Sequence, residues 1–239
     1  MLKVKKIVLF FLLLVSGFVF LRNSAMAVDY IANVVFVGNK GSGKTYLCSK
    51  FLERDLSGIN SRSFSHVLKN MGQVGSNTFA LKVWDTIGEE RYRELVEGFC
   101  RYANVAIVVL NLERVSNEDL DSFLIRNLDY YCEAIMKVSP NCGIIIALNE
   151  TVPLTPIRRE RVLSRIDLIL RGILDDGHYA NLAFLRRNLN DNEIKTLIEQ
   201  CVRDALVHPD VLRSLSTRDD GINIIKVVSG SCSYSVEYV

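Results

Sequence analysis

Residues 38–45 read Gly38-Asn39-Lys40-Gly41-Ser42-Gly43-Lys44-Thr45, and this stretch decides the fold of the chain. It has the form G-x-x-x-x-G-K-T, which is the phosphate-binding P-loop. Successive backbone N–H groups can turn inward around a phosphate chain only where glycines permit close approach. We therefore expect residues 38–45 to hold the phosphates of a nucleoside triphosphate.

The residues on both sides of this loop match the context that a P-loop requires. Val34-Val35-Phe36-Val37 predicts a buried parallel strand, and residues 45–54 predict a helix with apolar residues on one face. We expect Lys44 to reach the β and γ phosphates and the Thr45 hydroxyl to bind Mg²⁺. A glycine-rich turn that matches by chance is disfavoured, because strand, helix, lysine and threonine are all in place.

Composition sets broader limits. The chain has 239 residues, of which 49% are hydrophobic and 23% charged, so it can bury one main core and carry an appendage. The net charge is +2, with no block of like charges, and this argues against a nucleic-acid partner. The six cysteines form no C-x-x-C pair and no cluster with histidine, so we expect reduced thiols in the core.

The first 27 residues have the pattern of a signal peptide or a membrane anchor. Lysines precede an apolar run at residues 7–21, and Ala25-Met26-Ala27 fits a secretory cleavage site. The run is shorter than the roughly 20 residues of a usual spanning helix, although a tilted anchor would suffice. Residues 7–21 are therefore a candidate for membrane contact.

This pattern conflicts with the P-loop, because nucleoside triphosphates are ordinarily found in the cytosol. Residues 1–25 are compatible with an export signal, with an anchor, or with a segment that is never made because Met26 is the start. The protein would be exported or membrane-associated if Met1 is the start, and cytosolic if Met26 is.

The remainder of the chain alternates predicted strands with predicted helices, which indicates an α/β fold with helices on both faces of a parallel sheet. We expect a loop at 57–65 and a hairpin turn at 72–77. Ser116 and Asp119 have the spacing of a capping box for a helix that ends near Val138. The other predicted strands are 64–71, 78–84, 105–110, 144–148, 181–185 and 222–228, and the other predicted helices are 156–174 and 192–207.

A second motif follows the third predicted strand. Trp84-Asp85-Thr86-Ile87-Gly88-Glu89-Glu90-Arg91-Tyr92 reads W-D-T-x-G-x-E-R-Y. Together with the P-loop, it resembles the Ras superfamily of small GTPases, and most closely the Rab branch, over residues 30–207. The resemblance implies a three-layer P-loop NTPase fold with a mostly parallel six-stranded sheet. It implies a Ras-like GTP-binding domain at 28–208, followed by a C-terminal extension at 209–239.

The resemblance also implies roles for residues of this second motif. Asp85 would hold Mg²⁺ through water, and Gly88 would donate its backbone N–H to the γ-phosphate. Small GTPases usually have a glutamine after this glycine to orient the attacking water, whereas this chain has Glu89. A carboxylate is repelled by the γ-phosphate unless it is protonated or paired. We therefore predict slow GTP hydrolysis.

The first switch of the family contributes a threonine to Mg²⁺, and the spacing from Lys44 and Asp85 puts Ser63 at that position. Serine keeps the hydroxyl. An equal alternative is that Ser63 is one of several loop serines, since Ser61 and Ser65 stand nearby.

Guanine specificity in the family depends on N-K-x-D, and here the corresponding residues are Asn149-Glu150-Thr151-Val152. Asn149 is retained as a candidate nucleotide contact. Val152 replaces the aspartate that accepts two hydrogen bonds from guanine, and such a loss is large enough to erase the preference for guanine over adenine.

Three hypotheses follow. The first is a Rab-like switch that binds GTP or GDP with Mg²⁺ and contacts effectors or regulators through its switch loops. The second is a pseudo-GTPase scaffold that acts through its surface. The third is a P-loop NTPase of relaxed base specificity. All three share the fold, so the fold does not separate them.

Overall fold

A computed structural model describes residues 28–54, 65–113, 115–150, 154–174, 178–186 and 189–216. From residue 29 onward, the described residues belong to one compact unit, Asp29–Gly221. Its strands are β1 (Tyr30–Val37), β2 (Ser65–Val74), β3 (Asn77–Asp85), β4 (Val105–Asn111), β5 (Gly143–Glu150) and β6 (Ala180–Arg186). Its α-helices are α2 (Lys44–Leu52), α3 (Val96–Cys100), α4 (Leu120–Leu124), α5 (Tyr130–Val138), α6 (Pro156–Ile173), α7 (Asp191–Leu206) and α8 (Pro209–Ser216).

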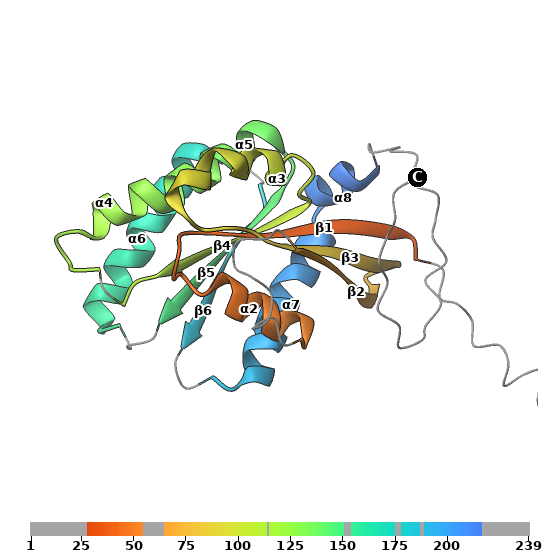
Figure 1. Ribbon diagram of the computed structural model, residues 1–239, viewed down its shortest axis with the longest axis horizontal. Helices are drawn as coiled ribbons and strands as arrows, with labels where there is room; N and C mark the ends of the chain where they lie inside the picture. The colour runs from red at the N-terminus through yellow and green to blue at the C-terminus, as the bar shows by residue number, and fades with distance from the viewer. Residues whose placement is uncertain are drawn as a thin grey trace, which may run out of the picture. The chain divides into compact units, whose positions relative to one another are not determined.

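The strands form one six-stranded sheet in the order β2-β3-β1-β4-β5-β6. β2 and β3 are antiparallel, and every other neighbouring pair is parallel. Figure 1 shows helices on both sides of this sheet. The structure thus confirms the predicted α/β fold with a mostly parallel sheet of six strands.

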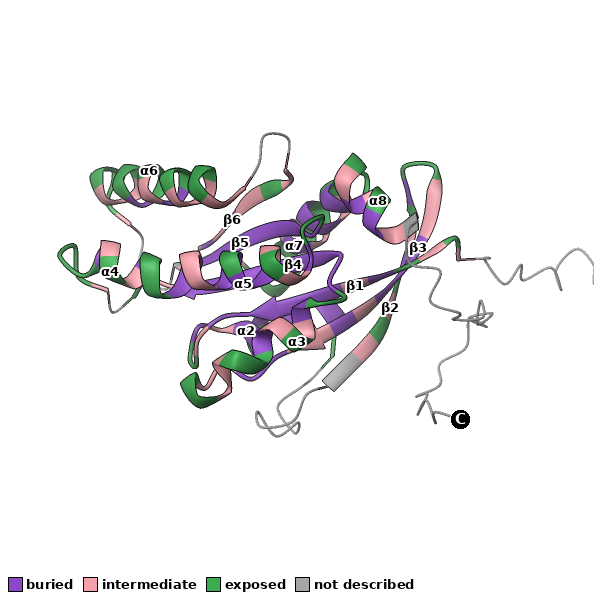
Figure 2. Ribbon diagram, turned by 90° about the horizontal axis from the view of Figure 1, so that it is seen from above, coloured by how far each residue is buried: buried purple, intermediate pink, exposed green. Residues whose placement is uncertain are grey.

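Two hydrophobic clusters hold the helices to the sheet. One joins β1, β3 and β4 to α2, α7 and α8, and the other joins β1, β4 and β5 to α3, α4, α5 and α6. Alternate side chains of β1 enter opposite clusters, so that Val34 and Phe36 face one and Val35 and Val37 the other. The central strands are therefore buried on both faces (Figure 2), which explains their continuous apolar sequence.

The hairpin between β2 and β3 is shorter than predicted. The turn lies at Gly75 and Ser76, whereas Gly72 lies within β2. The pairing register shifts between Asn70 and Gly72, and Gly72 has a φ of +65°. Its left-handed backbone accommodates an irregularity inside the strand instead of ending it. Gly72 therefore belongs to a bulge within β2. The prediction of a turn over 72–77 was wrong at its start, because the turn begins at Gly75.

The long helix predicted after Ser116 is present, but it has an irregular middle. The α-helical turns of α4 and α5 are joined by a π-helical turn at Ile125–Asp129. The Ser116 hydroxyl accepts a hydrogen bond from the Asp119 N–H at 3.0 Å and donates one to the Asp119 carboxylate at 2.7 Å. The helix itself starts at Leu120.

Three helical segments were not predicted, namely a 3₁₀ helix and α3 before β4, and α8 after α7. A 3₁₀ helix at Glu90–Leu95 leads from the W-D-T-x-G motif into α3. α8 follows α7 directly, although 192–207 was predicted to be the last helix, and its Val211 is fully buried. The buried Asn104 side chain donates to the Ser214 hydroxyl of α8 at 2.9 Å and accepts from the Asn33 N–H at 2.8 Å.

Several expectations fall outside the residues that the structure describes. These are the signal peptide or anchor at 1–27, the loop from residue 57 to 64, the strand at 222–228 and the tail at 229–239. Within the described residues, no helix combines the length and the apolar character needed to cross a membrane.

Candidate nucleotide-binding site

The P-loop follows the carboxyl end of β1 and leads directly into α2, as its sequence predicts. Gly43 precedes α2 with a φ of +99°, a left-handed conformation that favours glycine. A Cβ atom at Gly43 would lie 2.7 Å from the Asn149 side-chain nitrogen. Conformation and close approach therefore both require glycine at this position, where the loop passes into the N-terminus of α2, the kind of helix end that favours anions.

Lys44 is buried within this loop, with 6% of its surface exposed. Its ammonium group donates to the Asn39 carbonyl at 2.6 Å and lies 3.4 Å from the Ser42 hydroxyl. Burial lowers the pKa of Lys44 to about 8, although the Asp85 carboxylate opposes this shift. An anion beside Lys44 would compensate this desolvated charge, and phosphate is the anion that the loop geometry suits.

Thr45 and Asp85 meet at the other side of the loop, although they are 40 positions apart in the chain. The Thr45 hydroxyl donates to Asp85 Oδ2 at 2.7 Å. Asp85 Oδ1 is buried and has no hydrogen-bond partner among the described residues. Burial raises the pKa of Asp85, while the hydrogen bond from Thr45 and the charge of Lys44 oppose the rise.

This pair of oxygen donors fits Mg²⁺. Hydroxyl and carboxylate oxygens are hard ligands of the kind that Mg²⁺ takes, and a cation would satisfy the unpaired Asp85 oxygen. When bound, Mg²⁺ would neutralise phosphate charge. Ser63, the third predicted ligand, lies outside the described residues.

Gly88 lies against the P-loop. Its carbonyl accepts a hydrogen bond from the Lys40 N–H at 2.6 Å. A Cβ atom at Gly88 would lie 2.6 Å from the Asn39 carbonyl carbon and 2.7 Å from the Gly38 oxygen, and it would also collide with Lys44 Nζ. The second motif and the P-loop are therefore in direct contact, as their predicted roles require.

The Glu89 carboxylate lies near one cation of the P-loop and one cation of its own motif. Its carboxylate lies 2.8 Å from the Arg91 guanidinium and 3.9 Å from Lys40 Nζ. Asn149, at the end of β5, lies on the opposite side of the loop, with its side-chain nitrogen 3.4 Å from the Ser42 carbonyl oxygen. The structure thus brings the described phosphate-site candidates together around the P-loop. Val152 lies outside the described residues.

A polar network behind the P-loop was not predicted. Asn127, in the π-helical turn, is 4% exposed. It accepts hydrogen bonds from the Asn39 side chain and from Arg93, and it donates to the Phe123 carbonyl at 2.7 Å. Tyr131 donates to the Asn39 side chain at 3.0 Å. The network ties the loop to α4, α5 and the 3₁₀ helix. Its signal in the sequence was an asparagine seven residues after Leu120, on the buried helix face.

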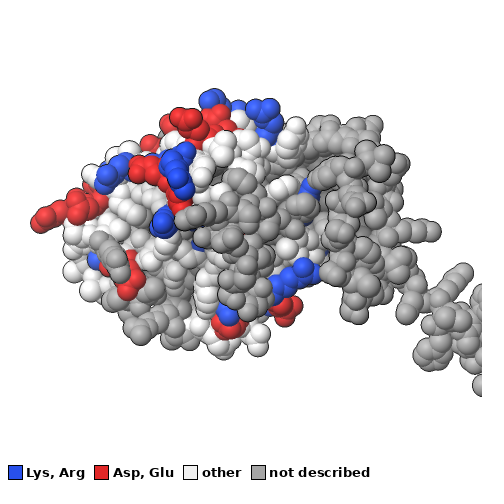
Figure 3. Space-filling model, in the orientation of Figure 1, with Lys and Arg blue, Asp and Glu red and all other residues white. Residues whose placement is uncertain are grey.

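A pocket of about 400 Å³ opens beside the first half of the loop. It is lined by loop residues, by the end of β4 and by the following segment; the lining residues are Asn39, Lys40, Gly41, Ser42, Val109, Leu110, Asn111, Glu113 and Phe123. On the described surface visible in Figure 3, basic and acidic side chains lie next to one another. The pocket itself is lined by groups of both signs, since Lys40 and Glu113 both belong to its lining.

Comparisons with known proteins agree with this geometry. A family model described as Roc, the Ras of Complex domain of DAPkinase, matches residues 33–151. The chain is 27% identical over 92 residues to Ras-related protein Rab-17 of Mus musculus, covering 38% of this chain and 43% of the relative. It is 33% identical over 99 residues to Ras-related protein YPTC6 of Chlamydomonas reinhardtii, covering 40% and 45%.

A third relative extends the match. The chain is 29% identical over 126 residues to Ras-related protein RIC2 of Oryza sativa subsp. japonica, covering 52% of this chain and 54% of the relative. The chain thus spans about half the length of the curated relatives it matches. Fold, P-loop geometry, the second motif and these similarities agree. The chain belongs to the Ras superfamily of small GTPases and resembles its Rab branch.

Proposed function

We propose that this chain is a Rab-like molecular switch that binds a guanine nucleotide with Mg²⁺ and hydrolyses GTP slowly. The observation that supports this proposal most directly is the buried Lys44 ammonium, held inside the P-loop beside the Thr45–Asp85 pair. A lysine and a carboxylate, both desolvated, suit a ligand that brings phosphate to one and a cation to the other.

Slow hydrolysis follows from Glu89. The residue after Gly88 must orient a water molecule beside the γ-phosphate, and a carboxylate engaged with Arg91 at 2.8 Å is poorly suited to that task. A turnover rate equal to that of an ordinary small GTPase, lost on Glu89→Ala, would contradict this part of the proposal. The switch itself needs no fast chemistry. Ordering of the loops around Ser63 and Gly88 by a triphosphate would create the surface for effectors or regulators.

A second candidate function is a P-loop NTPase of relaxed base specificity, which the substitution at Val152 favours. The phosphate-binding residues are those of the family, whereas the carboxylate that reads guanine is missing. A site without that carboxylate would lose its discrimination against adenine.

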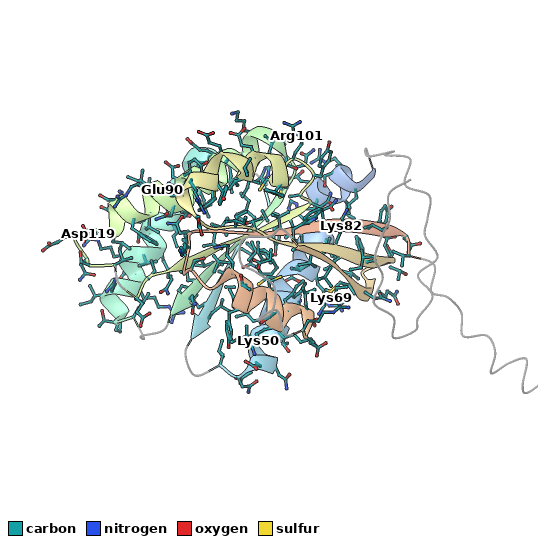
Figure 4. The ribbon with its side chains drawn as sticks, viewed as in Figure 1. Lys50, Lys69, Lys82, Glu90, Arg101 and Asp119 are labelled. Carbon is teal, nitrogen blue, oxygen red and sulfur yellow. The ribbon has the colours of Figure 1, made fainter. Side chains whose placement is uncertain are left out.

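The test is calorimetric titration of the full-length chain, stripped of bound nucleotide, with GTP, GDP and ATP in the presence of Mg²⁺. We expect tight guanine binding that Lys44→Ala weakens on the order of 100-fold, because charge-assisted hydrogen bonds contribute about 1.5–3 kcal/mol each. Lys50→Ala is the matched control, since it removes a half-buried lysine of the same helix that pairs with Asp191, a residue outside the P-loop (Figure 4), and it should leave binding unchanged.

Each outcome selects one hypothesis. Guanine-selective binding that depends on Lys44 supports the switch. Equal affinity for GTP and ATP supports relaxed specificity. Failure to bind any of the three nucleotides would reject both and leave the pseudo-GTPase scaffold.

A further inference from the structure

Lys40 and Glu89 carry opposite charges on the two segments that flank Lys44. Lys40 Nζ lies 3.9 Å from Glu89 Oε1, and the Arg91 guanidinium lies 2.8 Å from the other carboxylate oxygen. The Lys40 side chain is 80% exposed and that of Glu89 only 24%. Glu89 is thus held closely by Arg91, whereas Lys40 is at the outer limit of an ion pair and remains free to turn.

The backbone fixes where this pair lies. The Lys40 N–H donates to the Gly88 carbonyl at 2.6 Å, so residues 40 and 89 are adjacent through their backbones and not only through their side chains. Gly88 itself is packed against Lys44 Nζ and the Asn39 backbone. Because the P-loop lysine reaches the β and γ phosphates, Lys40 and Glu89 flank the position of the terminal phosphate.

We propose that Lys40 and Glu89 determine the preference of this site for triphosphate over diphosphate. Lys40 pairs with Glu89 when the nucleotide ends at the β-phosphate, and it turns to the γ-phosphate when one is present. This inference rests on the proposed function and adds two specificity-determining residues to it.

The physical reason is an exchange of partners with unequal strength. An exposed ion pair at 3.9 Å contributes little, so Lys40 loses little by leaving Glu89. A γ-phosphate carries more negative charge than a carboxylate and accepts a stronger charge-assisted hydrogen bond from an ammonium group. Glu89 acts in the opposite sense, because its carboxylate repels the same phosphate at short range and Arg91 offsets only part of that repulsion.

The two residues therefore have opposite effects on the same ratio of affinities. A residue that merely supports the loop would change the affinity for diphosphate and triphosphate together. Opposite shifts from two neighbouring residues are specific to charge discrimination at the γ-phosphate.

The experiment measures dissociation constants of the full-length chain for GDP and for a non-hydrolysable GTP analogue, both with Mg²⁺. We expect Lys40→Ala to weaken binding of the analogue about tenfold while changing the affinity for GDP less than about twofold. Lys40→Arg should restore the ratio. Glu89→Gln should strengthen binding of the analogue relative to GDP by about threefold to tenfold.

Two matched controls test charge removal at other positions. Glu90→Gln removes the exposed neighbouring carboxylate, and Lys82→Ala removes a lysine that lies 4.9 Å from the Trp84 ring on β3 (Figure 4). Both should leave the ratio of affinities within about twofold, because neither side chain belongs to the Lys40–Glu89 pair.

Failure of the inference and failure of the proposed function give different results. If the unaltered chain binds both nucleotides but Lys40→Ala leaves their ratio unchanged, or if Glu89→Gln lowers it, the assignment is wrong while the switch stands. If the unaltered chain binds neither nucleotide, the proposed function is rejected and this assignment with it.

Discussion

Gly88 is the residue at which the segment after β3 comes closest to the P-loop backbone. A methyl group there would overlap the Asn39 and Gly38 backbones, at 2.6 and 2.7 Å, and would also meet the Lys44 ammonium. Backbone atoms cannot move aside as a flexible side chain can. Residue 88 is therefore a glycine because of this contact and not because of its own φ angle.

We predict that Gly88→Ala lowers the free energy of unfolding by about 1–3 kcal/mol, the usual cost of overpacking. Urea denaturation of both proteins without nucleotide measures this difference. Gly172→Ala is the control, since a Cβ atom there meets nothing within 4 Å in a helix, and alanine should stabilise it by about 0.5–1 kcal/mol. Equal stability of Gly88→Ala and the unaltered protein would mean that residue 88 does not pack on the loop in solution.

The sequence alone indicated which residues lie together at the P-loop, because these residues are consecutive or occur at characteristic spacing. The P-loop spans eight successive positions, and Asp85 and Gly88 lie three apart. The ion pairs of Glu89 and the hydrogen bonds of Asn127 could not be predicted, because they join residues whose proximity depends on packing. Asn39 and Asn127, for example, are 88 positions apart in the chain.

Asn127 is the central residue of the π-helical turn between α4 and α5. It is buried and engages Asn39, Arg93 and the Phe123 carbonyl. A π-helical turn widens the helix by one residue, and such turns are often found at functional sites. Here the widened turn brings an amide side chain to the back of the P-loop.

We predict that Asn127→Leu destabilises the protein by about 1–3 kcal/mol, because it removes the acceptor of the half-buried Asn39 amide and one acceptor of Arg93, whose guanidinium keeps its hydrogen bond to the Arg126 carbonyl. Thermal and urea unfolding measure the effect. Asn117→Leu makes the same chemical change at an exposed position before α4 and should alter stability by less than about 0.5 kcal/mol. If both variants lost the same free energy of unfolding, the hydrogen bonds of Asn127 would not stabilise the protein.

The start of α7 illustrates an element that local chemistry specifies well. The Asn190 side chain accepts from the Glu193 N–H at 3.0 Å, and the Glu193 carboxylate accepts from the Asn190 N–H at 2.7 Å. This reciprocal arrangement satisfies two N–H groups at the helix start. It is encoded within four residues, and the predicted start at Asn192 differs from the observed Asp191 by one position.

We predict that Asn190→Ala costs about 1 kcal/mol of stability through loss of this cap. Asn192→Ala, at an exposed position inside the first turn, should be neutral or slightly stabilising because alanine favours the helix. The two unfolding curves, recorded under the same conditions, give the comparison. A cost at Asn192 as large as at Asn190 would contradict the capping role.

Strands and long helices were likewise predicted well from local sequence. For the strands, burial on both faces gives β1, β4 and β5 unbroken apolar runs. The 3₁₀ helix at Glu90–Leu95 has no buried residue, so the sequence contains no apolar pattern that would predict it. α8 was missed because it is short and because it lies beyond residues 30–207, over which the sequence resembles the family. Its first residue is a proline, which is well suited to the first turn of a helix.

At the scale of the molecule, the candidate site and α8 lie at opposite ends of the sheet strands. The P-loop, Asp85 and Asn149 follow or occupy the carboxyl ends of β1, β3 and β5. This is the end at which parallel sheets bind ligands. α8 contacts the amino ends instead, because Asn104 precedes β4 and Gly143 begins β5. The helix can therefore support the fold without touching the candidate site.

Val211 makes this support testable. It is fully buried, and a Cβ atom at Gly143 would lie 3.0 Å from its side chain, so α8 fits closely over the start of β5. We predict that Val211→Ala lowers the free energy of unfolding by about 2 kcal/mol, from two methyl groups removed and the cavity they leave. Val207→Ala, which makes the same change at a side chain 46% exposed, should cost less than about 0.5 kcal/mol.

Nucleotide affinity separates support of the fold from a role in the site. Val211→Ala should leave the dissociation constants for GDP and GTP unchanged at a temperature at which the variant is folded, because α8 and the P-loop lie at opposite strand ends. If the folded variant bound nucleotide more weakly, α8 would be coupled to the candidate site at the other end of the strands. Unchanged stability would show that α8 does not pack on β5 in solution, and Asn104 would then need another partner for the amide that now donates to Ser214.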